Sequence, residues 1–137
     1  MRERKEYTKP LPNPTPLTQF FWDACKRHEL VVQKCLACSK LNFPPQPTCT
    51  GCFSTELGWE VVSGKGKVYS YSIVHRPQTP DFEVPYVVVI VLLDEGPYML
   101  GNLEGCPSED VDINMPIEVF FDDVTKDFSL FKFKPRI

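Results

Sequence analysis

Four closely spaced cysteines constrain this chain more than any other feature of its sequence. Cys35, Cys38, Cys49 and Cys52 form two Cys-x-x-Cys pairs in the stretch CLACSKLNFPPQPTCTGC. Two such pairs can turn all four sulfurs towards one point, which is the tetrahedral thiolate shell that Zn²⁺ prefers. Because four thiolates leave no open coordination position, the spacing predicts one structural ion that supports a segment too small for a core of its own.

Other uses of these cysteines fit the sequence less well. No long apolar stretch follows the charged start of the chain, so we expect a cytoplasmic protein without a membrane span, where disulfides are rare. A thioredoxin-type redox pair begins a helix, and Pro44, Pro45 and Pro47 forbid a helix between the pairs. An iron ion takes the same geometry, so iron stays open beside zinc.

The N-terminal part predicts an arm followed by a helix. Residues 1–14 are polar and proline-rich, which favours an extended arm. Thr15 suits the N-cap and Pro16 suits the first helical position. Trp22 lies outside the apolar face and is expected to meet a second surface. The apolar side chains that recur at helical spacing are Leu17, Phe20, Phe21, Ala24 and Cys25.

The remainder of the chain predicts short strands. Segments rich in Val, Ile, Phe and Tyr cover residues 59–63, 66–76, 86–96, 98–105, 117–123 and 128–134. The sequence Glu95-Gly96-Pro97 predicts a hairpin between two of them. Residues 87–93 are apolar without alternation, which predicts a strand buried on both faces. About five strands in so few residues favour a Greek-key barrel of the OB type, with an SH3-like barrel as the alternative.

Charge argues against one class of partner. The 137 residues carry a net charge of -3, with 15 Lys and Arg against 18 Asp and Glu. Domains that bind nucleic acid through phosphates usually have a basic surplus, because their cations replace condensed counterions. The charge balance therefore disfavours nucleic acid as the main partner. The strand-rich segments described above predict a mainly β protein.

Several stretches together resemble the DUF35 family. They are LVVQKCLACSKLNFPPQPTCTGC, GWEVVSGKGKVYSYSIVHRP, VPYVVVIVLLDEGPYMLGNLEG and DINMPIEVFFDD. The resemblance implies an N-terminal arm and helix (1–32), a rubredoxin-like zinc ribbon (33–56) and an OB-fold barrel (57–137). Ser39 and Phe53 stand where the family usually has glycine after each cysteine pair. Since glycine accepts positive φ, we expect slightly strained turns at both positions.

The resemblance also implies a function. Family members bind thiolase-superfamily enzymes, of the acyl-CoA thiolase, hydroxymethylglutaryl-CoA synthase or steroid side-chain aldolase type, or an enoyl-CoA hydratase. They are taken to hold or channel acyl-CoA, while the catalytic residues lie on the partner. We therefore expect a non-catalytic accessory subunit in a hetero-oligomer, with the arm, the helix face around Trp22 and the ribbon at the interface. The alternatives are a nucleic-acid-binding zinc-ribbon OB-fold module and a free-standing enzyme that uses Cys106 or a carboxylate.

Few side chains suggest ligand contact. Lys65 and Lys67 in the sequence SGKGK are candidates for CoA phosphates, although their glycines also mark a β-bulge. His75 and Arg76 follow a strand at an expected barrel mouth. Tyr69 and Tyr71 are expected on one strand face, as OB-fold stacking residues are.

The remaining polar groups favour structural roles. We expect His28 to cap the carbonyls of the first helix, and Cys25 to lie in the core. Cys106 has no histidine near it in the sequence, so no catalytic residue is predicted. The acidic pairs, which are expected to face solvent in turns, are Asp81/Glu83, Glu109/Asp110 and Asp122/Asp123.

Overall fold

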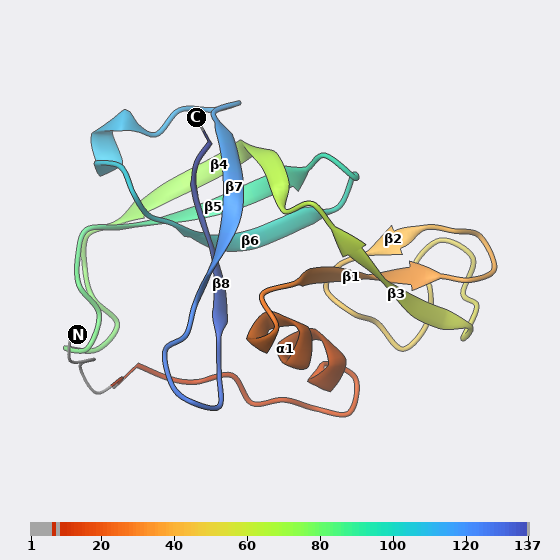
Figure 1. The fold of residues 1–137 in the computed structure, drawn as a ribbon. Helices are drawn as coiled ribbons and strands as arrows, with labels where there is room; N and C mark the ends of the chain where they lie inside the picture. Colours follow the sequence, from red (N-terminus) through yellow and green to blue (C-terminus); the bar gives the residue numbers. More distant parts are fainter. Residues whose placement is uncertain (1–6, 8, 137) are drawn as a thin grey trace.

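The computed structural model describes Tyr7 and residues 9–136, and it divides into a ribbon with its helix and a barrel (Figure 1). The first part contains α1 (Gln19–Lys26), β1 (Leu30–Cys35), β2 (Leu41–Asn42) and β3 (Leu57–Val62). The second contains β4 (Lys65–Val74), β5 (Tyr86–Leu93), β6 (Tyr98–Leu103), the short 3₁₀ helix η1 (Ser108–Asp110), β7 (Pro116–Asp122) and β8 (Leu130–Pro135). Within the described residues, no helix is both long and apolar enough to cross a bilayer.

The five strands after the ribbon close into the expected OB-type barrel. Their order around the barrel is β4-β5-β6-β8-β7, and β4 returns to pair with β7. All pairs are antiparallel except β6 with β8, which meet in parallel at Leu103 and Phe133. The hairpin predicted at residues 95–97 joins β5 to β6. The mainly β fold with one helix and a Greek-key barrel is confirmed.

Strand β5 differs from its prediction. Val87, Val89, Val91 and Leu93 point into the barrel and are buried, but the residues between them are partly or largely exposed. Ile90 is 38% exposed. The uninterrupted run of Val, Ile and Leu does not reveal that only one face of β5 is buried, because both faces carry apolar side chains. The outer apolar face of this strand is therefore a surface feature.

Two glycines allow the chain to turn into the barrel. Gly64 has a φ of +76°, and a Cβ built there would lie 2.1 Å from Cγ1 of Val119. A Cβ on Gly66 would lie 2.4 Å from the carbonyl oxygen of Leu92 on the neighbouring strand. A register shift between Val68 and Ser70 then bends β4, which agrees with the bulge suggested by the glycine-lysine sequence.

The ribbon is built on a three-stranded sheet of order β2-β1-β3. Strand β3 pairs with β1 over all six of its residues, from Leu57 opposite Cys35 to Val62 opposite Leu30. Residues 57–62 thus belong by pairing to the ribbon sheet, and the barrel begins with β4. Buried Gln33 of β1 fixes the loop between the cysteine pairs by exchanging two hydrogen bonds, of 2.9 and 3.0 Å, with the backbone of Gln46.

Helix α1 connects the two parts. The turn that precedes it is closed by reciprocal hydrogen bonds between Thr15 and Thr18, so regular α-helix begins later than the expected N-cap. Its buried residues are Phe21, Ala24 and Cys25. Trp22 is partly buried against the core, and its ring lies 6.5 Å from that of Phe131 on β8. One hydrophobic core runs continuously from the helix through β1 into the barrel.

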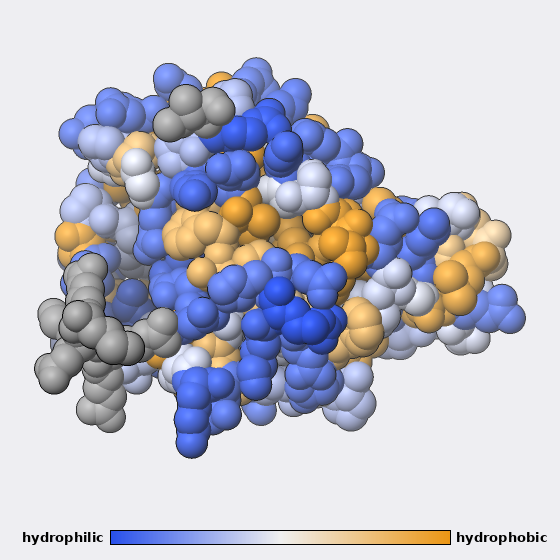
Figure 2. All heavy atoms as spheres, in the orientation of Figure 1, coloured by the Kyte–Doolittle hydropathy of each residue, from blue (hydrophilic) through white to orange (hydrophobic). Residues whose placement is uncertain are grey.

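The segment before the helix contacts the barrel. Tyr7 is partly buried, and burial raises the pKa of its hydroxyl. The Lys9 ammonium lies 5.4 Å from the centre of the Phe82 ring, an ordinary cation–π distance. Figure 2 shows that apolar side chains gather in the middle of the visible face of the molecule and again towards the tip of the ribbon. Residues 1–6 and 8 of the predicted arm lie outside the described residues.

Candidate metal centre and neighbouring pockets

The four ribbon cysteines converge as the sequence predicted. Their sulfur atoms all lie within 4.8 Å of one another. The pairs Cys35–Cys52 and Cys38–Cys49 have sulfur separations of 3.6 Å. Sulfurs about 2.3 Å from a tetrahedral zinc ion stand roughly 3.8 Å apart, so the residues present fit a single metal ion. Four sulfur ligands close its coordination shell, which assigns the site a structural role.

Backbone N–H groups favour the thiolate form of two ligands. The N–H groups of Cys52 and Gly51 lower the pKa of Cys49 to about 6. The N–H of Cys38, which lies 3.4 Å from the sulfur of Cys35, lowers the pKa of Cys35 in the same way. Metals bind thiolates rather than thiols, so these hydrogen bonds prepare the ligands for coordination.

One side chain that sequence reasoning missed supports the site. Asn42 is buried, and its amide Nδ2 lies 3.8 Å from the sulfur of Cys49. The Thr50 hydroxyl donates a 2.6 Å hydrogen bond to the Asn42 carbonyl oxygen and fixes the orientation of the amide. The position of Asn42 on the short strand β2, opposite Gln33, brings it to the metal centre. The sequence signal that could have identified Asn42 is its position between the two cysteine pairs.

The two departures from family glycines have the predicted backbone geometry. Ser39 has a φ of +67° and Phe53 a φ of +63°, both in the left-handed region. Each residue follows the second cysteine of a pair, where its N–H donates to the carbonyl of the first: Ser39 to Cys35 and Phe53 to Cys49. Phe53 is 76% exposed, so its ring gains little from packing within this chain.

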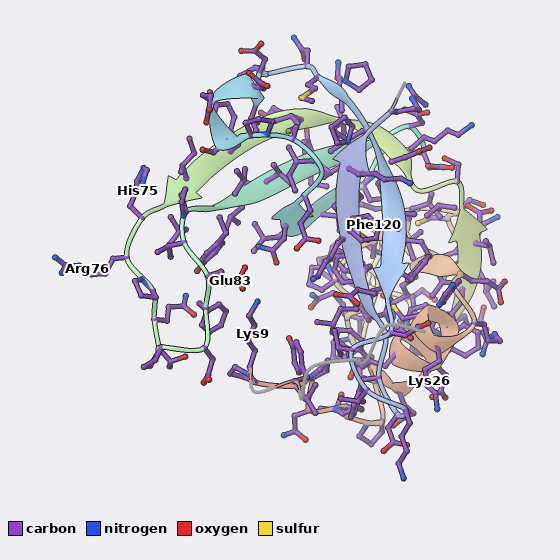
Figure 3. The ribbon with its side chains drawn as sticks, turned by 60° about the vertical axis from the view of Figure 1, so that its left-hand side comes forward. Lys9, Lys26, His75, Arg76, Glu83 and Phe120 are labelled. Atoms are coloured by element: carbon purple, nitrogen blue, oxygen red, sulfur yellow. The ribbon has the colours of Figure 1, made fainter. Side chains whose placement is uncertain are left out.

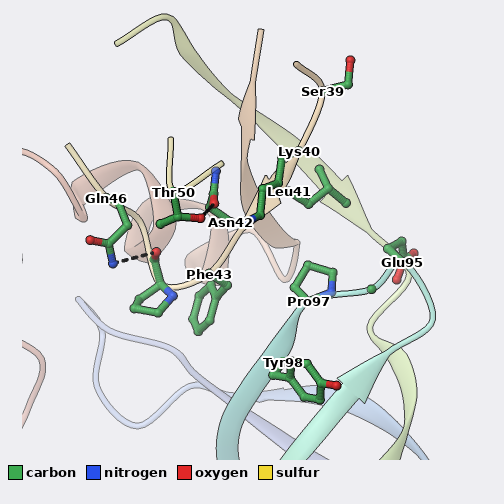
Figure 4. Close-up of a pocket in the computed structure, with 12 residues that line it drawn as sticks. Ser39, Lys40, Leu41, Asn42, Phe43, Gln46, Thr50, Glu95, Pro97 and Tyr98 are labelled. Carbon is green, nitrogen blue, oxygen red and sulfur yellow. Dashed lines mark hydrogen bonds between the residues drawn. The ribbon is translucent and has the colours of Figure 1, made fainter. Parts of the chain in front are cut away.

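One pocket lies between the ribbon and the barrel, and a second lies on the barrel beside the arm. The first, of about 590 Å³, lies between the loop after the first cysteine pair and the β5–β6 turn (Figure 4). Phe43 and Leu41 line one side, and Pro97 and Tyr98 line the other. The second, of about 520 Å³, lies on the barrel beside Tyr7 and Lys9 and includes Cys106.

A largely buried lysine and two partly exposed carboxylates form an ion-pair network beside the second pocket. Lys132 keeps only 14% of its side chain exposed, and its ammonium contacts Asp122 at 2.8 Å and Glu104 at 3.3 Å. Burial by itself lowers the pKa of Lys132, but the hydrogen bond and charge of Asp122, together with Glu104, raise it overall. Asp122, which was expected to face solvent, keeps 39% of its side chain exposed and also holds this lysine.

The loop after β4 separates the other sequence candidates. His75 and Arg76 are exposed and point away from the body of the molecule, whereas Lys9 and Glu83 face each other across the space between the arm and the loop (Figure 3). Lys67 lines a third, smaller hollow of about 400 Å³ on the barrel. Lys65, two residues earlier on β4, is exposed. The structure thus keeps the lysine candidates apart from His75 and Arg76.

The aromatic candidates also separate. The ring of Tyr69 lies 4.9 Å from that of Tyr98 on the outer barrel surface. Tyr71 follows the bulge and pairs with Val89, whose side chain points into the barrel. The bulge interrupts the regular alternation of β4 between the two tyrosines, and both side chains are exposed.

His28 caps a helix carbonyl through its backbone, as expected, and its side chain has a second role. It ends the helix with a φ of +60°, its ring stacks on Phe121 at 5.3 Å, and its Nε2 lies 2.8 Å from the Asp123 carboxylate. Ser129 donates its hydroxyl to the same carboxylate. The backbone N–H of His28 donates a 2.9 Å hydrogen bond to the Cys25 carbonyl, and the histidine side chain joins the helix end to the β7–β8 hairpin.

The two cysteines outside the ribbon have weakly acidic thiols. Cys25 is fully buried in the core, as predicted, and burial raises its pKa to about 12. Burial, assisted by the charge of Asp110, also raises the pKa of Cys106. Both thiols therefore stay protonated at neutral pH, which is the unreactive form. The pairs Asp81/Glu83 and Glu109/Asp110 are exposed.

Comparison with known proteins decides the family. The models described as the ChsH2 rubredoxin-like zinc ribbon domain and the ChsH2 C-terminal OB-fold domain match residues 22–58 and 59–122. A DUF35 domain-containing scaffold protein of Methanocaldococcus jannaschii is 38% identical over 104 residues, which cover 74% of each chain. This chain belongs to the DUF35 family. The family membership and the order of ribbon and OB-fold barrel agree with the resemblance seen in the sequence.

Two further proteins are similar to this DUF35 chain. A probable enoyl-CoA hydratase alpha subunit of Thermomonospora curvata is 37% identical over 118 residues, or 86% of this chain but only 37% of the relative. The chain thus spans little more than a third of the length of that subunit. A solved structure described as the Ltp2-ChsH2(DUF35) aldolase superposes with a TM-score of 0.87 at 35% identity, covering 93% of this chain and all of the matched one.

Proposed function

We propose that this DUF35 protein is a non-catalytic accessory subunit that binds a thiolase-like enzyme and helps to hold or channel acyl-CoA. The observation that carries the proposal is the whole-length match to the DUF35 chain of the Ltp2-ChsH2 aldolase. The relative named as a hydratase alpha subunit supports an acyl-CoA setting, and an enoyl-CoA hydratase-like partner is the second possibility within this function.

The chemistry of the chain supports a partner-dependent role. A catalytic site needs a nucleophile or an acid–base pair within hydrogen-bonding reach. Cys106 has a raised pKa, and the His28 ring is occupied by Phe121 and Asp123. The ribbon sulfurs close the shell of one metal ion, which we propose to be zinc because four thiolates in two Cys-x-x-Cys pairs form a typical structural zinc site.

The outer barrel surface favours a protein partner over nucleic acid. OB-folds usually bind oligonucleotides across their second and third strands, here β5 and β6. Neither strand contains Lys or Arg, and their outer residues include Ile90, Tyr98 and Leu100, the last 61% exposed. Such a surface lacks the cations that a phosphate backbone requires. The nucleic-acid-binding alternative therefore has little support.

The ribbon tip is one part of the proposed interface. Each Cys-x-x-Cys pair with its turn forms a cysteine knuckle. Phe53 and Leu36, from the two knuckles, are 76% and 65% exposed. Phe53 combines a strained backbone with a ring exposed to solvent. Contacts within the described part of the chain do not explain this combination. We infer that these side chains are covered by the partner, together with the arm. We propose that Trp22, which is partly buried and lies beside Phe131, also contributes to the interface.

The test is purification of the tagged chain from its native cells. We expect a thiolase-like or hydratase-like polypeptide in equimolar amount, no acyl-CoA turnover by the chain alone, and one zinc per chain by elemental analysis. The variant Phe53→Ser should lower recovery of the partner, whereas Thr55→Ser, on the same exposed loop, should not. Recovery of the chain alone, or with nucleic acid that salt removes, would contradict the proposed function.

A further inference from the structure

Strand pairing lines up side chains in rows across the barrel surface, and one row is rich in cations. Lys67 of β4 lies opposite Leu92 of β5 on one side and Pro116 of β7 on the other. The N–H of Arg136 donates a 3.0 Å hydrogen bond to the Pro116 carbonyl, which extends the row past the end of β8. Across the neighbouring strands, the residues of this row are therefore Leu92, Lys67, Pro116 and Arg136, in that order.

The adjacent row provides an internal comparison. There, Lys65 lies opposite Glu118, and Glu118 lies opposite Lys134. An acidic residue thus separates two cations, which is the arrangement that balances charge on an ordinary strand surface. In the first row the residue between the cations is an uncharged proline. Across the described part of the chain, none of these four cations forms an ion pair, so the two rows differ in the charge of the residue between the cations.

The uncompensated row borders a hollow. Lys67, Arg136, Asn114, Pro116 and Asp94 are among the residues that line a depression of about 400 Å³. Neighbouring strands are about 4.8 Å apart, so the Cα atoms of Lys67 and Arg136, two strands apart, are separated by roughly 10 Å. Asn114 has a φ of +68°, and its N–H donates to Val68 at 2.7 Å, which fixes the loop beside the row.

We propose that this hollow binds the phosphorylated adenosine head of an acyl-CoA. The Lys67 ammonium and the Arg136 guanidinium would hold a phosphate between them, and Arg suits the bidentate contact. Asp94 repels a bare anion but accepts hydrogen bonds from a ribose hydroxyl or an adenine amino group. The site therefore fits a phosphate monoester on a nucleoside better than free phosphate. This inference rests on the proposed function for the choice of acyl-CoA as the ligand.

The test measures binding of adenosine 3′,5′-bisphosphate to the full chain by calorimetry at low ionic strength. We expect the double variant Lys67→Gln/Arg136→Gln to weaken binding about tenfold or more, since it removes both charge-assisted contacts. Lys65→Gln changes charge equally on the compensated row and should leave affinity within about twofold. Pro116→Glu, which places an acid between the two cations, should weaken binding as strongly as the double variant.

Two further titrations identify which kind of phosphate compound the hollow binds. Inorganic phosphate and adenosine, titrated separately, should each bind at least tenfold more weakly than the bisphosphate. Equal affinity for inorganic phosphate would overturn the nucleotide assignment, and equal loss in Lys65→Gln would overturn the site. Partner recovery from cells should be unchanged in the double variant. Failure to recover a partner while the bisphosphate still binds at this hollow would contradict the proposed function and leave the site standing.

Discussion

At the scale of single residues, the metal centre combines ligands that sequence spacing identifies with neighbours that only the fold reveals. The cysteine spacing is enough to predict four converging sulfurs, because each pair is a local turn. Asn42 and the His28–Asp123 contact were not predictable, because each depends on segments brought together by strand pairing. The positive φ of Ser39 and Phe53 was predictable, because the knuckle turn itself demands it.

The strained knuckle residues give a prediction with two readouts. Ser39→Gly and Phe53→Gly should each raise the free energy of unfolding by up to about 1 kcal/mol, because glycine adopts positive φ without a Cβ clash. Denaturant unfolding at a fixed zinc concentration measures this change. Thr55→Gly is the control, since it adds chain freedom at an exposed position outside the positive-φ set and should lower stability slightly.

The same substitutions separate stability from assembly. Phe53→Gly should weaken recovery of the partner even though it stabilises the chain, whereas Ser39→Gly should stabilise without loss of the partner. A chain that loses stability in both glycine variants would show that the left-handed turns carry no strain. If Phe53→Gly assembles normally with the partner, the Phe53 ring is not part of the interface.

At the scale of elements, strand positions followed from composition, but their partners and faces did not. The expected segments agree with β3 to β8 to within a few residues at most ends. Pairing of β3 with β1 was invisible, because a short β-rich segment can join either sheet. The exposed side of β5 was hidden by its apolar residues, and the bulge in β4 disturbed the alternation that sequence reading assumes.

Strand β4 also provides an element-scale prediction about close backbone approach. Gly66→Ala should lower the free energy of unfolding by about 3 kcal/mol or more, because its Cβ would lie 2.4 Å from the Leu92 carbonyl oxygen and 3.0 Å from Val91. Gly58→Ala is the matched strand control. Its Cβ would meet only the flexible, exposed end of Leu36 at 3.1 Å, so we expect a change below about 1 kcal/mol. Denaturant unfolding compares the two, and similar losses would contradict the clash.

At the scale of the whole molecule, one core serves two parts of unequal independence. Leu30, Val31 and Val32 of β1 belong to the same buried cluster as the barrel residues Val89 and Phe133. Beyond Cys35 the ribbon contributes few buried apolar side chains, and its loops converge on the four sulfurs. The barrel should therefore fold without the metal, whereas the cysteine knuckles should not.

Metal removal tests this division directly. After chelation, or in Cys38→Ser, we expect hydrogen exchange to accelerate strongly for amides in residues 36–56, because metal binding supplies the folding free energy of such a segment. Amides of Val89 and Val91 should keep their protection, since their strand pairs on both sides within the barrel. Cys25→Ala, which removes a cysteine outside the cluster, controls for loss of a thiol and should leave the knuckle amides protected. If chelation instead exposed the barrel amides as well, the metal would be holding the whole core, and the ribbon and barrel would form one cooperative unit.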